Sequence, residues 1–401
     1  MDLTYSAEHE EFREGALDFA RRVVEPGLRE RDQEAQADEA IYRKMGAEGY
    51  LGVCIPERYG GLGLDYHTLA ILSDAFEYID TSARVIISVH NGLHSLALLQ
   101  WGTEAQKMQY LAPLARGERL ATYCLTEPAC GSDVAGLQAF AEKKGSRYVL
   151  NGEKIWISLS TVADQYLVMA YTDREKQKAR DHSGISAFIV ERAWNGVKPY
   201  ALHGKLGVRA GITGGVAFQN VDVPAENMVG HADEGFKVAM SALDNGRYTV
   251  AAGSVGLMRA SLDASAKYCH ERVTFKREIG KHQLVQQMIA CMRQSIDVGD
   301  LLVRKAGWMK NQGRRNTRET SMAKWVNTVN AQTCADHAIE IHGAYGYSNE
   351  FPVERFWRNS RGAVIYEGTK EVHQVMQAEY ALGYREDAPL RCELPAWPYQ
   401  G

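Results

Sequence analysis

The sequence predicts an α+β protein of several domains: a helical N-terminal domain, a middle β-barrel or sandwich domain and a C-terminal four-helix bundle. Up to about residue 115, apolar residues recur at the three-to-four spacing of amphipathic helices. After that the period shifts toward two, which favours strands. No proline lies between Pro224 and Pro352, so long helices fit there. We expect domains at 1–120, 121–230 and 231–385, followed by an extended tail at 386–401 that leaves the bundle.

Local signals predict the individual elements. Amphipathic periodicity indicates helices over 10–26 and 68–79, separated by a turn-rich loop at 56–66. Asn151-Gly152 is a strong hairpin signal and predicts a turn between two short strands within 147–158. Further strands are expected at 165–171, 184–190 and 215–224, and long helices at 236–272, 284–310 and 320–343.

The composition is that of an ordinary globular protein. The 401 residues are 45% hydrophobic and 24% charged, and 46 basic against 50 acidic side chains give a net charge of −4. This balance argues against a nucleic-acid partner. We see no apolar run long enough to span a membrane and no signal peptide, so we expect a cytoplasmic protein. The seven cysteines are scattered without a CxxC pair, which argues against disulfides and structural zinc.

Two segments of the β region could hold a flat polar ring. Residues 123–133 combine small polar side chains with backbone donors around Gly131, although such a segment is by itself only a turn. Trp156 and Ser158 occupy alternate strand positions, which would put an aromatic plane and a hydroxyl on one sheet face. The commoner role of a strand tryptophan is to fill the core.

Three further patterns in the helical regions could carry chemistry. Arg272, Thr274, Phe275 and Gln283 fall at a helix junction where they could clamp a diphosphate, although a junction arginine more often forms a surface ion pair. Glu367, between an aromatic residue and a glycine, could be a desolvated general base or part of a helix cap. His90 and His94 have the i, i+4 spacing of metal ligands, but no carboxylate completes a site, so we expect no metal.

Six ordered blocks resemble the acyl-CoA dehydrogenase family, from about Ser6 to Leu382. They are YCLTEPACGSD, NGEKIWIS, KLGVRAGITGGVAFQNVDVP, RVTFKREIGKHQ, IHGAYGYS and IYEGT. The resemblance implies helical, β and helical domains, with FAD bound between the last two and across a subunit boundary. It also implies a homotetramer that oxidises an acyl-CoA and passes electrons to electron-transfer flavoprotein.

The resemblance also assigns roles to individual residues. It identifies Glu367 as the base that removes the α-proton of the thioester while the β-hydrogen leaves as hydride to flavin N5 on the opposite face. Some members place the base where this chain has Gly246, which cannot serve. The implied cofactor contacts are Tyr123, Leu125, Thr126, Ser132, Trp156, Ser158, Arg272, Thr274, Phe275, Gln283, Glu340, Ala344 and Thr369. Ser132 would also lie near the pantetheine, and Arg247 and Tyr366 would line the acyl-CoA channel.

Several positions depart from the family pattern. Lys276 and Ala344 stand where glycine is usual, and Glu340 replaces a glutamine. Ser158 replaces a threonine and Cys130 a smaller residue. Two rival functions remain: an acyl-CoA oxidase whose reduced flavin reacts with oxygen, and a flavin-binding or structural protein without catalysis.

Segment 77–89 is similar to the glutaryl-CoA dehydrogenase branch, where an arginine and a serine matching Arg84 and Ser88 receive a free substrate carboxylate. An arginine on an apolar helix is costly to bury unpaired, so an anionic acyl group gives a reason for Arg84, and pairing with Glu77 or Asp80 is the alternative. Gly246 removes side-chain volume and would suit a branched or aromatic acid. We therefore expect benzylsuccinyl-CoA, an intermediate of anaerobic toluene degradation, ahead of glutaryl-CoA.

Overall fold

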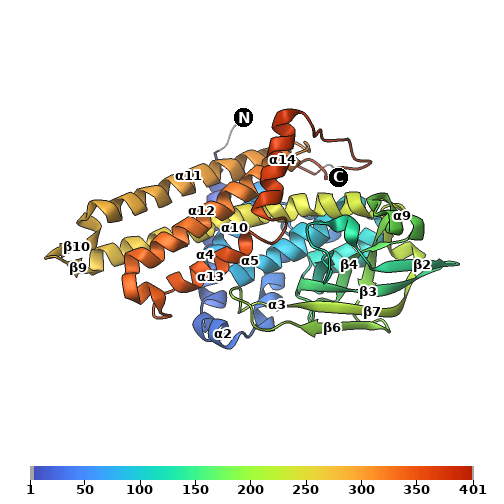
Figure 1. The fold of residues 1–401 in the computed structure, drawn as a ribbon, viewed down its shortest axis with the longest axis horizontal. Coiled ribbons are helices and arrows are strands. Elements are labelled where there is room, and N and C mark those ends of the chain that lie inside the picture. Colours follow the sequence, from blue (N-terminus) through green and yellow to red (C-terminus); the bar gives the residue numbers. More distant parts are fainter. Residues whose placement is uncertain (1–3, 400–401) are drawn as a thin grey trace.

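A computed structural model describes residues 4–399 and shows the predicted succession of helical, β and helical domains (Figure 1). The α+β fold class is confirmed. In the described chain, no helix is long and apolar enough to cross a membrane. The N-terminal helices are α1 (Ala7–Phe19), α2 (Leu28–Glu34), α3 (Glu39–Ala47), α4 (Tyr66–Ile79), α5 (Thr81–Ile87), α6 (Leu96–Trp101), α7 (Glu104–Gln106) and α8 (Ala112–Ala115), with π-helical turns at Ala20–Val24, Ser88–Ser95 and Lys107–Leu111.

The middle domain is built on one eight-stranded sheet in the order β6-β7-β3-β2-β4-β5-β8, and β1 pairs with β4. Most neighbouring strands of this sheet pair antiparallel, but the pairings β1–β4 and β2–β4 are parallel. Helix α9 (Arg174–Ala179) connects β4 to β5. The strands are β1 (Ala121–Cys124), β2 (Phe140–Lys144), β3 (Arg147–Ser158), β4 (Gln165–Tyr171), β5 (Ile185–Glu191), β6 (Val197–Ala201), β7 (Thr213–Pro224) and β8 (Met228–Val229).

The hairpin predicted at Asn151-Gly152 is wrong. Strand β3 runs through both residues, and its register against β7 shifts between Leu150 and Gly152. Asn151 Oδ1 accepts the Asn220 backbone N–H at 2.9 Å, so the pair forms a β-bulge instead of a turn. The turn before β3 is at Gly145, whose φ is +63°.

A second irregularity in β3 affects the candidate flavin side chains. The register shifts again between Ile155 and Ile157, and the intervening Trp156 has a φ of +62°. This bulge interrupts the simple alternation from which we placed Trp156 and Ser158 on one face. Trp156 is 61% exposed, so it does not fill the core.

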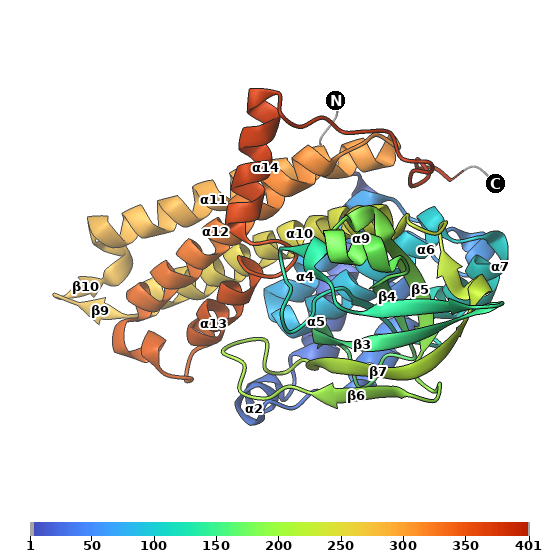
Figure 2. The same ribbon diagram turned by 45° about the vertical axis from the view of Figure 1, so that its right-hand side comes forward.

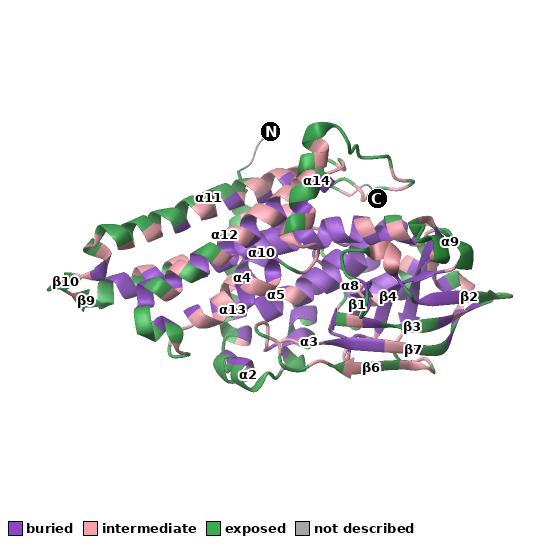
Figure 3. Ribbon diagram, in the orientation of Figure 1, coloured by how far each residue is buried: buried purple, intermediate pink, exposed green. Residues whose placement is uncertain are grey.

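The C-terminal domain consists of long helices lying side by side, with shorter helices packed against one of them (Figure 2). They are α10 (Gly235–Glu271), α11 (Gln283–Asn311), α12 (Thr317–His342), α13 (Val353–Ala363) and α14 (Lys370–Leu382), and a short hairpin of β9 (Val273–Thr274) and β10 (Arg277–Glu278) joins α10 to α11. Helix α10 packs against both α4 and α12, so it connects the first and last domains. This central position explains why α10 is mostly buried along its length (Figure 3).

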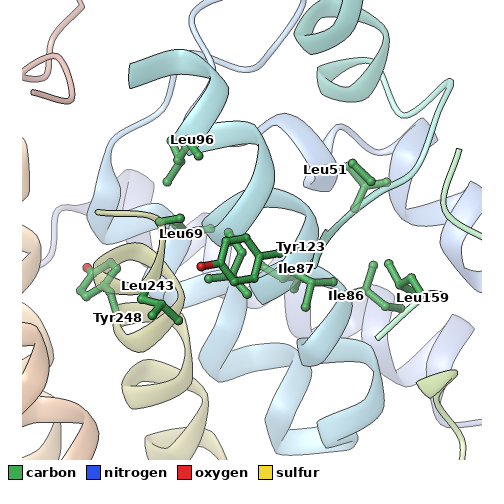
Figure 4. Packing of buried hydrophobic residues seen from close by; sticks show 14 of the residues in the cluster. Leu51, Leu69, Ile86, Ile87, Leu96, Tyr123, Leu159, Leu243 and Tyr248 are labelled. Carbon is green, nitrogen blue, oxygen red and sulfur yellow. The ribbon is translucent and has the colours of Figure 1, made fainter. Parts of the chain in front are cut away.

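One continuous apolar core joins the three domains. Figure 4 shows side chains of the first domain packed near Tyr123 of β1 and Leu243 of α10. We expected the tail as an extended arm that leaves the bundle, and the structure shows where this segment lies. The Tyr399 hydroxyl donates to the Cys54 carbonyl at 2.6 Å and the Trp397 indole donates to the Gly63 carbonyl at 3.0 Å, so the tail lies on the N-terminal domain.

Candidate active site

Glu367 lies in the short loop between α13 and α14, with its backbone in the left-handed region at φ +56°. Arg247 of α10 donates through Nε to the Glu367 carbonyl at 3.2 Å. Lys324 of α12 donates to the next carbonyl, that of Gly368, at 2.6 Å. A side chain in left-handed backbone is strained, and strain of this kind persists where surrounding contacts fix it. The two cations therefore hold this loop.

The Glu367 carboxyl is poised as a base. Its Oε2 atom is buried and has no hydrogen-bond partner in the described part of the protein. Desolvation raises the pKa of Glu367 to about 7, and the charges of Arg84, Lys324 and Arg247 oppose this rise. The carboxyl can therefore accept a proton near neutral pH.

Gly246 makes room for this carboxyl. A Cβ atom at position 246 would lie 2.2 Å from Oε2 of Glu367 and 2.6 Å from Cδ2 of Leu93. The space left by the missing side chain is therefore occupied by Glu367 and Leu93. We had related that space to a bulky acyl group, and the structure gives it a different use.

Arg84 stands at the centre of a buried polar cluster beside the Glu367 loop. It forms an ion pair with Glu77, and both side chains are only 1% exposed. Its Nη1 donates to the Ser88 hydroxyl at 2.9 Å, and its Nη2 donates to the Tyr366 hydroxyl. Among the described residues these three bonds use three of the five N–H groups of the guanidinium. The pairing with Glu77 considered from the sequence is therefore real, and donors are left for an anion.

Tyr123, Leu125 and Thr126 line the start of the middle domain. The first two are buried, and the Tyr123 hydroxyl donates to the Ala239 carbonyl of α10 at 3.2 Å. The Ile155 N–H donates to the Thr126 carbonyl at 3.0 Å, which places this segment beside the Trp156 bulge. The exposed indole of Trp156 next to this segment offers a flat aromatic surface, which suits a flat heterocycle.

A buried ion pair that we did not foresee supports this segment. Lys154 and Glu127 are 2.7 Å apart and almost fully buried, and Lys154 also donates to the Leu125 carbonyl at 3.0 Å. Glu127 accepts the backbone N–H groups of Gln138 and Ala139. The residues beside Lys154, Glu153 and Ile155, gave no local signal for this pair, because the fold supplies its acid partner from a distant segment.

Other residues predicted to contact the cofactor differ in their exposure and in their hydrogen bonds. Ser132 is exposed in the loop after Cys130, whose buried thiol donates to the Asp133 carbonyl at 2.8 Å. Ser158 is half-buried, and its carbonyl accepts the Thr122 hydroxyl at 2.6 Å. Thr369 caps α14 by accepting the Val372 N–H. The helix cap considered from the sequence for the Glu367 loop is therefore present.

The remaining predicted cofactor residues lie at the far end of the C-terminal bundle. Arg272, Thr274 and Phe275 belong to the β9–β10 hairpin region, which Figure 1 shows at the opposite end of the molecule from the sheet. Phe275 is 90% exposed. Stacking of Tyr268 on His342, with ring centroids 4.3 Å apart, brings the end of α12 to the same place. Gln283, Glu340 and Ala344 therefore belong to this far group.

The histidines of the π-helical turn are structural contacts. His90 and His94 are buried, and each hydrogen bonds to a backbone carbonyl, of Leu114 and Thr122 respectively. Burial lowers the pKa of His90 to about 4 and that of His94 to about 3. Among residues 4–399 no cluster of three or more histidine, cysteine or acidic side chains could hold a metal ion.

The family models decide the identity of the fold. The N-terminal, middle and C-terminal domains of acyl-CoA dehydrogenase match residues 6–118, 122–221 and 233–382. The chain belongs to the acyl-CoA dehydrogenase family. The short-chain specific acyl-CoA dehydrogenase of Clostridium acetobutylicum is 36% identical over 376 residues, covering 94% of this chain and 98% of the relative. The glutaryl-CoA dehydrogenase of Desulfococcus multivorans is 37% identical over 392 residues, covering 96% and 99%.

Solved structures agree with this assignment. A glutaryl-coenzyme A dehydrogenase in complex with glutaryl-CoA matches with a TM-score of 0.92 and 36% identity, over 96% of this chain and 98% of the other. A Mycobacterium smegmatis glutaryl-CoA dehydrogenase in complex with FADH2 matches with a TM-score of 0.89 and 27% identity, over 96% and 97%. The acyl-CoA dehydrogenase described here is an FAD-dependent oxidoreductase acting on CH–CH donors. The exposed Trp156 surface fits this cofactor.

Proposed function

We propose that this acyl-CoA dehydrogenase acts on a thioester whose acyl group carries a second carboxylate. Arg84 would bind that carboxylate, with Ser88 beside it, and Glu367 would remove the α-proton. The observation that carries the proposal is the Arg84 cluster, in which a guanidinium that is 1% exposed keeps two N–H groups beyond its contacts to Glu77, Ser88 and Tyr366. A carboxylate is the group that two such donors bind best.

Glu367 supplies the proton-transfer step. Its unpartnered Oε2 takes the α-proton, and the fixed loop keeps the carboxyl oriented toward the thioester. Gly246 leaves space for the carboxyl, and Arg247 holds the loop from α10. Bound FAD supplies the acceptor for the β-hydride. Tyr123, Leu125, Thr126, Trp156 and Ser158 are the residues proposed to surround its ring system.

Glutaryl-CoA is the simplest substrate that fits these features. Glu77 and Tyr366, which the glutaryl-CoA branch shares, both contact Arg84, and the glutaryl-CoA relatives support the choice. The case for benzylsuccinyl-CoA rested on free volume at Gly246, and Glu367 fills that volume. Benzylsuccinyl-CoA therefore becomes one arm of the test.

A second copy of the chain would complete the cofactor site. Arg272, Thr274, Phe275, Gln283, Glu340 and Ala344 lie far from the Trp156 surface within one chain, so their proposed contacts to FAD require a neighbouring subunit. Exposed apolar side chains on α11, among them Leu284 and Leu301, favour such an interface. We therefore propose a homotetramer, with electron-transfer flavoprotein as the electron acceptor.

Substrate preference tests the role of Arg84. We expect kcat/KM to be higher for glutaryl-CoA than for butyryl-CoA, with benzylsuccinyl-CoA as a third substrate. Arg84→Gln alone would leave Glu77 buried and unpaired, so the informative variant is Glu77→Gln combined with Arg84→Gln. Measured well above pH 7, where Glu367 stays ionised without the Arg84 charge, it should lose about 100-fold on glutaryl-CoA, roughly the 1.5–3 kcal/mol of a charged hydrogen bond, and little on butyryl-CoA. Equal losses on both thioesters would contradict the proposal.

Proton abstraction can be measured without oxidation. The β-carbon of 3,3-dimethylglutaryl-CoA carries no hydrogen, so this thioester can exchange its α-protons with D2O but cannot transfer a hydride. We expect exchange by the holoenzyme and an approximately 1000-fold loss in Glu367→Gln, the size of a general-base contribution. Full exchange by the variant would exclude Glu367 as the base, and peroxide release during turnover of glutaryl-CoA would favour an oxidase.

A further inference from the structure

Lys324 is a buried lysine whose hydrogen-bond partner is a neutral backbone carbonyl. The side chain is 0% exposed, and Nζ donates to the Gly368 carbonyl at 2.6 Å. Within the described chain it forms no ion pair, whereas the comparably buried Lys154 has Glu127 as a partner. A buried ammonium group without an acid partner is costly, so a neutral carbonyl alone does not explain why a lysine is here.

The position of the Gly368 carbonyl gives the explanation. It directly follows Glu367, whose own carbonyl is bound by Arg247 at 3.2 Å. Two cations from two different helices, α10 and α12, thus bind consecutive carbonyls of the loop that carries the base. Gly368 itself is in the left-handed region at φ +96°, and Glu367 is at +56°. Glycine adopts this backbone freely, whereas Glu367 needs external contacts to stay there.

We propose that Lys324 is a positioning residue for the base: it fixes the Glu367–Gly368 backbone and places a positive charge near the Glu367 carboxyl. This inference rests on the proposed role of Glu367. The Lys324 side chain has two effects on the base. Its hydrogen bond orients the loop, and its charge favours the ionised form of Glu367.

The electrostatic environment contains a defined set of groups. Glu367 faces Arg84 from α5, Arg247 from α10 and Lys324 from α12, and all three charges lower its pKa against the larger effect of burial. Burial lowers the pKa of Lys324 to about 7, with Arg247 and Arg84 acting in the same direction, while Glu367 and Glu371 of α14 raise it. His373 of α14 and the phenols of Tyr123 and Tyr366 complete the surroundings. The loss of the Lys324 charge should therefore raise the pKa of Glu367.

Two neutral substitutions separate the hydrogen bond from the charge. Lys324→Gln keeps an N–H donor that can reach toward the Gly368 carbonyl, and Lys324→Met keeps the length without a donor. The measurement is α-proton exchange of 3,3-dimethylglutaryl-CoA into D2O by the holoenzyme, as a function of pH. Lys324→Gln should move the midpoint of the acid limb upward by about one pH unit, which means a roughly tenfold lower rate below that limb. Lys324→Met should show the same shift and also a lower plateau at high pH.

Lys205→Met is the matched control. Lys205 is half-buried, and its Nζ donates to the carbonyls of Val208 at 2.8 Å and Gly211 at 2.7 Å, outside the candidate site. We expect this control to lose stability without a shift in the exchange midpoint. Lys324→Arg keeps a charge at every pH, so its midpoint should lie at or below that of the unmodified enzyme.

Each result decides the question. The inference would be overturned if both neutral variants exchanged more slowly at high pH while the pH midpoint of exchange stayed unchanged. Lys324 would then be only a packing residue. If neither neutral variant folds, a midpoint in Lys324→Arg above that of the unmodified enzyme would overturn it. Absence of exchange in the unmodified enzyme would instead count against the proposed function, so the two failures are distinguishable.

Discussion

At the scale of single residues, the proposed role of Glu367 as the base depends on how far water is excluded from its carboxyl. Burial favours the protonated carboxyl, and three cations oppose it, so the pKa rises only to about 7. A base works when it is ionised, so the rate should fall as pH drops below this value. We expect kcat/KM for glutaryl-CoA to decrease about tenfold for each pH unit below about 6.5. A pH profile that is flat from 8 to 5 would show that the ionisation of Glu367 does not control the reaction.

Gly253 of α10 is the residue that allows the Arg84 ion pair to form. A Cβ atom there would lie 2.2 Å from Oε2 of Glu77 and 2.9 Å from Nε of Arg84. Gly253→Ala should push this buried pair apart and lower kcat/KM for glutaryl-CoA about tenfold, roughly 1.4 kcal/mol, with a smaller effect on butyryl-CoA. Steady-state kinetics with both thioesters checks this.

Gly15→Ala on α1 serves as the control for this substitution. A Cβ atom at position 15 meets nothing within 4 Å. The variant should therefore keep its kinetics and gain about 0.5–1 kcal/mol of stability from the better helix propensity of alanine. An equal kinetic loss in both variants would remove the special role of Gly253.

Sequence reasoning could single out only those candidate site residues that belong to local motifs. Glu367 and Arg84 stood out because an acid between an aromatic residue and a glycine and an arginine on an apolar helix both demand an explanation, and the family resemblance then assigned their proposed roles. Lys324, Gly253 and Lys154 were not, since their importance arises from groups far away in the chain that the fold brings next to them. No spacing rule reports a contact of that kind.

At the scale of elements, long periodic helices were predicted closely and the irregular strand was not. Helices α10, α11 and α12 begin and end within a few residues of the expected bounds because their periodicity extends over many turns. Strand β3 contains two bulges, and a bulge uses the same Asn-Gly chemistry as a turn. Only pairing with β7 distinguishes the two, and Phe218, the β7 partner of Gly152, lies 66 positions later in the sequence.

The β9–β10 hairpin offers a prediction at this scale. Its two-residue turn consists of Phe275 and Lys276, with φ values of +48° and +62°, as a type I′ turn requires. Left-handed backbone costs a non-glycine residue about 1–2 kcal/mol, and glycine loses about 0.5–1 kcal/mol through its greater unfolded-state freedom. Lys276→Gly should therefore raise the free energy of unfolding by about 0.5–1 kcal/mol in urea titrations. Lys281→Gly, outside this turn, should lower it, and a loss of stability in both would refute the strain argument.

At the scale of the whole molecule, two neutral histidines join the first domain to the middle sheet. His94 hydrogen bonds through Nδ1 to the Thr122 carbonyl at 3.1 Å and through Nε2 to the Gln165 amide nitrogen at 2.8 Å. His90 likewise bonds to the Leu114 carbonyl and accepts the Ala121 N–H, both at 3.2 Å. Each ring therefore donates with one nitrogen and accepts with the other, which requires the neutral form.

This arrangement makes the stability of the domain junction depend on pH. The pKa values of His90 and His94 are lowered from 6.5 to about 4 and about 3, so between pH 6.5 and 4 the unfolded chain binds protons that the folded chain excludes. Stability should fall as pH drops through this range, by about 2 kcal/mol per histidine at pH 5. Glutamine at position 94 keeps polar groups but does not titrate. Between pH 7 and pH 5, the unfolding free energy of His94→Gln should therefore fall by about 2 kcal/mol less than that of the unmodified protein. His203 is exposed, so the unfolding free energy of His203→Gln should change with pH as that of the unmodified protein does. If the unfolding free energies of all three proteins fell in parallel with pH, the buried histidines would not determine the loss of stability in acid.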